Sequence, residues 1–65
     1  MPREQLDETM TEDRRKAIFL ALVEAQDQGK TVAESRAEAS RQFDVTEDQV
    51  RAIEREGLDN EWPPL

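Results

Sequence analysis

The 65-residue chain contains no cysteine, no histidine and no tyrosine, and only 5% of its residues are aromatic. Without cysteine and histidine there is no disulfide framework, no zinc site of the usual kind, no thiol nucleophile and no imidazole base. A domain of about 60 residues also buries only roughly 60% of its unfolded surface, so its core is small. We therefore expect a non-catalytic protein with no cofactor, no metal and no small-molecule substrate.

Long apolar runs are also lacking. No stretch reaches the roughly 18 to 20 consecutive apolar residues that a membrane span requires. Residues 1–5 lead into carboxylates rather than into the apolar segment of a signal peptide. The chain has no internal repeat and no linker rich in glycine and serine. These absences predict a single cytoplasmic unit that does not contact membranes.

Acidic residues are abundant, and the formal net charge of −7 is unevenly placed. Residues 1–13 hold one cation and five carboxylates, and residues 56–65 hold three carboxylates and no cation. Residues 14–55 hold eight of each, so the net charge lies in the two ends. Acidic ends are typical of solubilising tails, and a tail that masks or mimics a polyanion site is the alternative interpretation.

The first amphipathic pattern runs over residues 11–28. Ile18, Leu22 and Ala25 recur there at i, i+4 and i+7, which is the spacing of one helix face. Two carboxylates fall in the first turn, where they complement the positive end of the helix dipole, and Gly29 supplies a stop. This segment is predicted to be the main helix of the core.

Two further helices are predicted from capping boxes at residues 31–34 and 46–49, where a threonine is followed three residues later by Glu or Gln. The second helix is expected to end near Phe43, and the third at Gly57. The short turn between them is typical of a helix-turn-helix. The residues expected to face inward are Val32, Ser35 or Arg36, Ala39 and Phe43 on the second helix, and Val50 and Ile53 on the third.

Together these segments predict an all-α fold, a small three-helix helix-turn-helix domain over residues 11–58. A flexible acidic segment is expected at residues 1–10, and an extended Trp/Pro tail at residues 59–65.

Residues 39–58 carry a set of small, aromatic and apolar positions around the predicted turn. The set comprises Ala39, Ser40, Phe43, Val45, Thr46, Val50, Arg51, Ile53, Glu54 and Leu58. In this pattern the segment resembles the helix-turn-helix of bacterial transcription regulators, most closely the promoter-reading C-terminal region of sigma factors. The resemblance implies a module associated with transcription that binds duplex DNA through its third helix.

Four side chains of the predicted third helix are candidates for contacts with nucleic acid. Arg51 and Arg55 are four residues apart and so share a face, and Thr46 and Gln49 can donate hydrogen bonds to bases or phosphates. The carboxylates at positions 47 and 48 repel phosphates, so we expect DNA binding to be weak or to need a protein partner from the transcription machinery. Alternatively, these charges form i,i+4 ion pairs on a solvated face.

A basic cluster, Arg14, Arg15 and Lys16, lies in the opening turns of the first predicted helix. In a helix-turn-helix domain such a cluster can contact the phosphate backbone without reading sequence. A solvated helix face is the alternative interpretation.

The tail ends in the sequence Trp62-Pro63-Pro64-Leu65, in which the two prolines prevent a helix from continuing. Trp62 and Leu65 either fold back over the apolar seam of the helices or form a linear docking motif for a protein partner. The alternative to DNA binding is therefore an acidic protein-interaction module, which presents a helical face or this tail.

Overall fold

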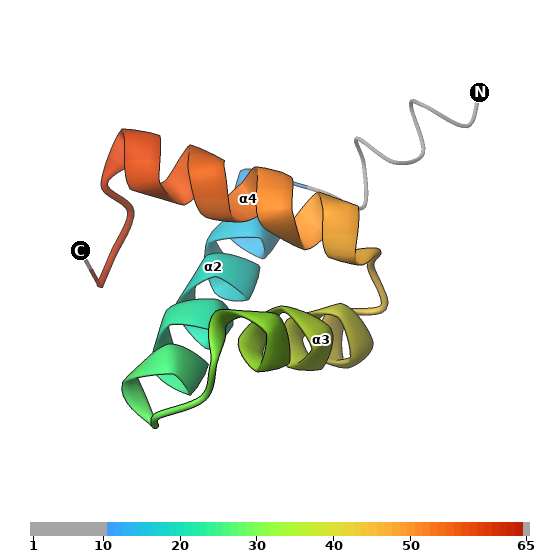
Figure 1. Ribbon diagram of the computed structural model, residues 1–65. Helices are drawn as coiled ribbons and strands as arrows, with labels where there is room; N and C mark the ends of the chain where they lie inside the picture. Colours follow the sequence, from blue (N-terminus) through green and yellow to red (C-terminus); the bar gives the residue numbers. More distant parts are fainter. Residues whose placement is uncertain (1–10, 65) are drawn as a thin grey trace.

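The computed structural model describes residues 11–64, which form three α-helices joined by short turns (Figure 1). The helices are α2 (Glu12–Asp27), α3 (Val32–Phe43) and α4 (Glu47–Asn60). The predicted all-α class is confirmed, and none of the three helices has the length and apolar character needed to cross a membrane. The predicted N-terminal segment at residues 1–10 lies outside the described residues.

Each helix begins after a threonine whose hydroxyl accepts a backbone N–H. The caps are Thr11, Thr31 and Thr46, with N···O distances between 3.0 and 3.2 Å. At the second and third caps the bond is returned, because Glu34 and Gln49 accept the backbone N–H of the capping threonine at 3.0 and 2.9 Å. Both predicted capping boxes are therefore confirmed, and the starts of α3 and α4 follow from local hydrogen bonding.

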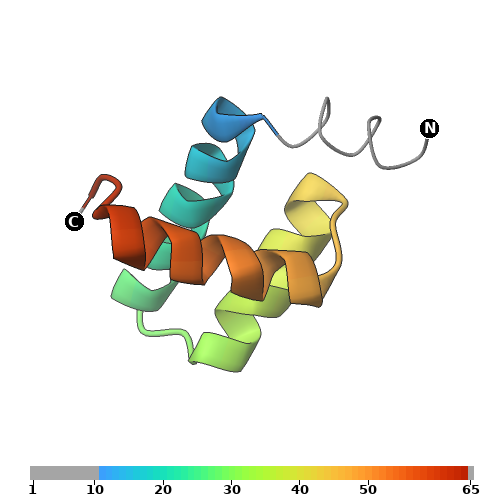
Figure 2. The same ribbon diagram turned by 90° about the horizontal axis from the view of Figure 1, so that it is seen from above.

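The core lies where α4 crosses both α2 and α3, as Figure 2 shows from above. Phe19 of α2 is fully buried at its centre, and the Trp62 ring meets it edge-on, with centroids 6.1 Å apart. Only 6% of Trp62 is exposed, so this side chain folds back over the helices, which was one of its two predicted placements. The other buried apolar residues of this cluster are Ile18, Leu22, Ala39, Val50 and Ile53.

The prediction that Gly57 ends the third helix is wrong. α4 continues to Asn60, and the chain leaves it at Glu61 in the left-handed conformation, with φ 53°. Gly57 is instead required by a close approach between helices: a Cβ placed on it would lie 2.3 Å from Cδ1 of Phe19. The tail consequently begins two residues later than expected.

The inward face of α3 also differs in one position from the predicted one. Val32, expected to face inward, is the first residue of the helix and is 45% exposed. Ser35 is fully buried, and its hydroxyl donates to the Val32 carbonyl at 2.8 Å and accepts from Gln26 of α2 at 3.2 Å. Of the two alternatives at positions 35 and 36, the serine is therefore the inward residue.

The turn between α3 and α4 is closed by bonds from both sides. Asp44 adopts the left-handed conformation that ends α3, and the Val45 N–H donates to the Ser40 carbonyl at 3.1 Å. The Ser40 hydroxyl donates in return to the Val45 carbonyl. These bonds fix the angle between the two helices, and with it the direction in which the outer face of α4 points.

Candidate nucleic-acid interface

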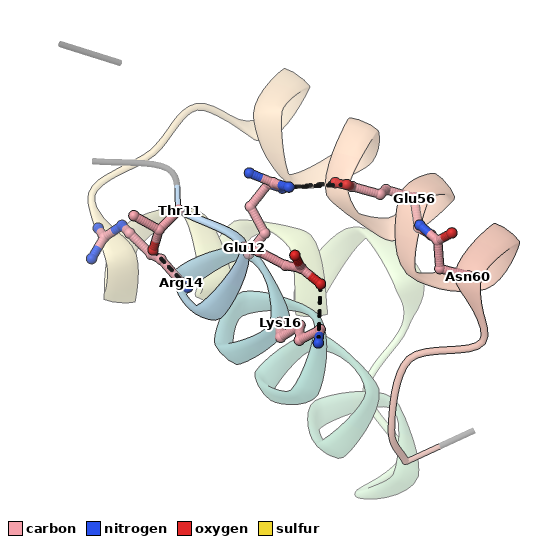
Figure 3. Close-up of polar contacts among 7 residues, drawn as sticks. Thr11, Glu12, Arg14, Lys16, Glu56 and Asn60 are labelled. Atoms are coloured by element: carbon pink, nitrogen blue, oxygen red, sulfur yellow. Dashed lines mark hydrogen bonds and ion pairs between the residues drawn. The ribbon is translucent and has the colours of Figure 1, made fainter. Parts of the chain in front are cut away.

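The basic cluster at the start of α2 is engaged in contacts within the fold. The guanidinium of Arg15 donates to both carboxylate oxygens of Glu56 on α4, at 2.9 and 3.2 Å. Lys16 pairs with Glu12 at 3.1 Å and lies 5.8 Å from the centre of the Trp62 ring. Figure 3 draws the Lys16–Glu12 pair, which lies within α2, and the ion pair that Glu56 forms with α2. The Arg15–Glu56 pair joins the first turns of α2 to α4, and Lys16 reaches the tail through its contact with the Trp62 ring.

Arg14, the third member of the cluster, reaches the end of α3. Its Nη2 donates to the carbonyl of Phe43, and its guanidinium lies 5.8 Å from the centre of the Phe43 ring. A cation at a helix C-terminus complements the partial negative charge of the last carbonyls. Two members of the predicted phosphate-contacting cluster, Arg14 and Arg15, thus join α2 to α3 and to α4.

Arg51 and Arg55 lie on the outward face of α4, and the fold holds them less firmly. The Arg51 side chain is 63% exposed, and its ion pair with Asp48 has a long distance of 3.6 Å. Asp48 is itself almost fully exposed, so water screens this pair and its contribution to stability is small. Arg55 is exposed and has no ion pair within residues 11–64. Both guanidinium groups are therefore available to a ligand.

Thr46 and Gln49, the two other predicted contacts on this helix, are partly occupied by the capping box. Each accepts a backbone N–H from the other residue, at 3.0 and 2.9 Å. The donors that remain for a ligand are the hydroxyl hydrogen of Thr46 and the amide NH₂ of Gln49. The structure therefore brings both residues to the start of α4, with fewer free polar atoms than the sequence alone indicates.

A shallow groove of about 650 Å³ lies along the same face, where α4 meets α3. Arg36 of α3 lines it and was not among the predicted contacts with nucleic acid. Its Nε and Nη2 both donate to Glu54, at 3.1 and 2.9 Å, so its charge is neutralised by the partner helix. No local spacing in the sequence indicates this pairing, because the two residues are 18 positions apart on different helices. The groove is lined by Arg36, Asp48, Arg51, Ala52, Glu54, Arg55 and Leu58.

The described part of the chain holds no group of three or more acidic side chains placed to bind a metal ion. No protein family, curated protein or solved structure matches the chain. The function of this face is therefore inferred from the residues that form it.

Proposed function

We propose that this helix-turn-helix module contacts duplex DNA through the outward face of α4, weakly on its own and more tightly beside a protein partner. The observation that carries the proposal is the division of the basic residues. Arg14 and Arg15 bond to the end of α3 and to α4, and Lys16 pairs with Glu12 within α2 and lies against Trp62. Arg51 and Arg55, in contrast, lie together on one exposed face of α4. The resemblance of residues 39–58 to sigma factors supports a role in transcription.

The chemistry of this face accounts for weak binding. Arginine donates in a fork that fits phosphate oxygens or the major-groove edge of guanine. Glu47 and Asp48 lie one turn before Arg51 and are exposed, so they oppose the approach of phosphates. With a net charge of −7, the chain also lacks long-range attraction to DNA. A weak contact through α4 can orient this module on DNA when a protein partner supplies most of the binding affinity.

Replacing Arg55 by glutamine should weaken DNA binding and make it less dependent on salt. Two phosphate contacts give a slope of log K against log salt of about −2, so the affinity of the unmodified chain should fall about tenfold between about 50 and 200 mM salt. Removing one contact should lower that slope by about 1. The measurement is fluorescence anisotropy of a labelled duplex. Arg41→Gln is the matched control, because Arg41 is equally a cation but is exposed on α3.

The proposal is contradicted if the unmodified chain does not bind the duplex even at low salt. It is also contradicted if Arg41→Gln and Arg55→Gln lose the same affinity, because the contact would then depend on total charge and not on α4.

Replacing Asp48 by asparagine should strengthen the same interaction. The change removes a carboxylate from the start of α4 and releases Arg51 from its ion pair. We expect an increase in affinity of about three- to tenfold at low salt, since a single charge at close range to phosphates has an effect of this order. Asp59→Asn is the control, because it changes the net charge equally at the other end of the helix. Equal gains in both variants would assign the effect to net charge and argue against a contact at this face.

A further inference from the structure

Within residues 11–64, one face of α2 packs against no other segment of the chain. Its residues follow the spacing i, i+4, i+7, i+11 and i+14, which is one stripe of a helix. The stripe lies opposite the buried residues Ile18, Leu22 and Ala25, and each of its members is exposed. We call it the outer face of α2, and its residues are Asp13, Ala17, Leu20, Glu24 and Asp27.

The charge of this face is of one sign. Asp13, Glu24 and Asp27 make no ion pair within residues 11–64, and no cation shares their stripe. By contrast, Glu56 and Glu54 of α4 are paired with cations of other helices, Arg15 and Arg36. The outer face of α2 therefore carries a negative potential that no ion pair among the described residues compensates.

An apolar centre interrupts these charges. Leu20 is 40% exposed, and Ala17 lies one turn before it on the same stripe. The exposed part of the Leu20 side chain contributes nothing to folding, because only apolar area removed from water is stabilising. An apolar centre with a charged rim is the composition of a protein-docking surface.

The negative charge of the outer face of α2 limits which molecules can bind it. The same face of a second copy would place carboxylates against carboxylates, and DNA or an anionic membrane would be repelled in the same way. We propose that the outer face of α2 docks a basic amphipathic segment of another protein. Lysines or arginines of that segment would pair with Asp13, Glu24 and Asp27, and an apolar side chain would pack on Leu20 and Ala17.

This docking surface is separate from the DNA contact. α2 packs on α3 and α4 with its opposite side, so α4 keeps its own outward face while the outer face of α2 is covered. The inference therefore goes beyond the proposed DNA contact and does not depend on it. If both hold, the basic segment belongs to the partner that raises the affinity for DNA.

The test uses the full chain labelled with ¹⁵N and a synthetic helical peptide of about 20 residues, composed of Lys, Leu and Ala with the leucines on one face. NMR titration should shift the amide signals of residues 13–27. Leu20→Gln should raise the Kd about tenfold, which is typical of losing a central apolar contact. Leu58→Gln is the matched control, because Leu58 is also an exposed leucine but belongs to α4.

The charged contacts are tested in the same titration. Glu24→Gln should raise the Kd for the peptide, whereas Glu47→Gln, which removes an exposed carboxylate of α4, should leave it unchanged. Amide shifts spread over all acidic residues would overturn the proposal, because they would indicate attraction to net charge alone. Equal Kd values for Leu20→Gln and Leu58→Gln would also overturn it, because the peptide would then not distinguish α2 from α4. The Leu20→Gln variant should bind DNA with the same affinity as the unmodified chain. The docking proposal for α2 and the DNA proposal for α4 can therefore fail independently of each other.

Discussion

Replacing Trp62 by alanine should lower the free energy of unfolding by about 3–5 kcal/mol. The ring is 6% exposed and meets Phe19 edge-on, so its removal leaves a cavity over the centre of the core. A small domain has a total stability of only about 5–15 kcal/mol, and the variant should therefore unfold at a much lower urea concentration. Urea titration followed by circular dichroism measures the change.

Two variants show whether this effect belongs to the buried ring. Trp62→Phe keeps an aromatic side chain against Phe19 and should lose less stability than the alanine variant. Leu58→Ala removes an apolar side chain that is 55% exposed and should change stability by less than about 0.5 kcal/mol. If Trp62→Ala unfolded at the same urea concentration as the unmodified chain, the tail would not cover the core in solution.

The burial of Trp62 also bears on the alternative function, a protein-interaction module that presents either a helical face or the tail. A docking motif with this ring as its anchor would first have to withdraw it from Phe19 and expose the core. Leu65, the other residue predicted for that motif, lies outside the described residues. An acidic protein-interaction module would therefore present a helical face instead of the tail. The outer face of α2 has the negative charge and the apolar centre that such a module needs.

The helix starts could be predicted from the sequence because their causes are local. A threonine and the residue three positions later form both bonds of a capping box, whatever the rest of the chain does. The same holds for Arg51 and Arg55, whose shared face follows from a separation of four residues. What this face binds is not a local property, and it stays a proposal.

The contacts that the sequence did not indicate join residues far apart in the chain. Arg15 meets Glu56 across 41 positions, and Arg14 meets the Phe43 carbonyl across 29. From spacing alone the basic cluster had two interpretations, a phosphate contact or a solvated face. Its contacts between helices depend on how α2, α3 and α4 cross, which capping and periodicity do not determine.

Gly57 is the residue at which a local rule and a long-range contact disagree. Glycine near the end of an apolar pattern usually marks a helix stop, and here it lies inside α4 because the Phe19 ring occupies the space of a side chain. Phe19 is fully buried, so the ring has no room to move away. The contact therefore sets how closely α4 approaches α2.

Replacing Gly57 by alanine should consequently destabilise the domain, although alanine is the better helix former. Alanine gains about 1 kcal/mol of helix propensity over glycine, whereas a Cβ 2.3 Å from the Phe19 ring forces α4 away from α2. We expect a net loss of about 2–3 kcal/mol, measured by urea titration. Gly29→Ala is the contrasting control: nothing lies near its Cβ position, and its cost of about 1–2 kcal/mol comes from a φ of 97°.

A second substitution assigns the loss to this one contact. Phe19→Leu shortens the side chain opposite Gly57, so the double variant should lose less stability than the sum of the two single variants. Additive losses would show that the Phe19 ring does not restrict Gly57. Because this contact holds α4 against α2, the Gly57→Ala variant should also displace the Arg15–Glu56 pair, whereas the capping bonds of Thr46 should persist. NMR spectra of the two regions distinguish a shifted helix from an unfolded one.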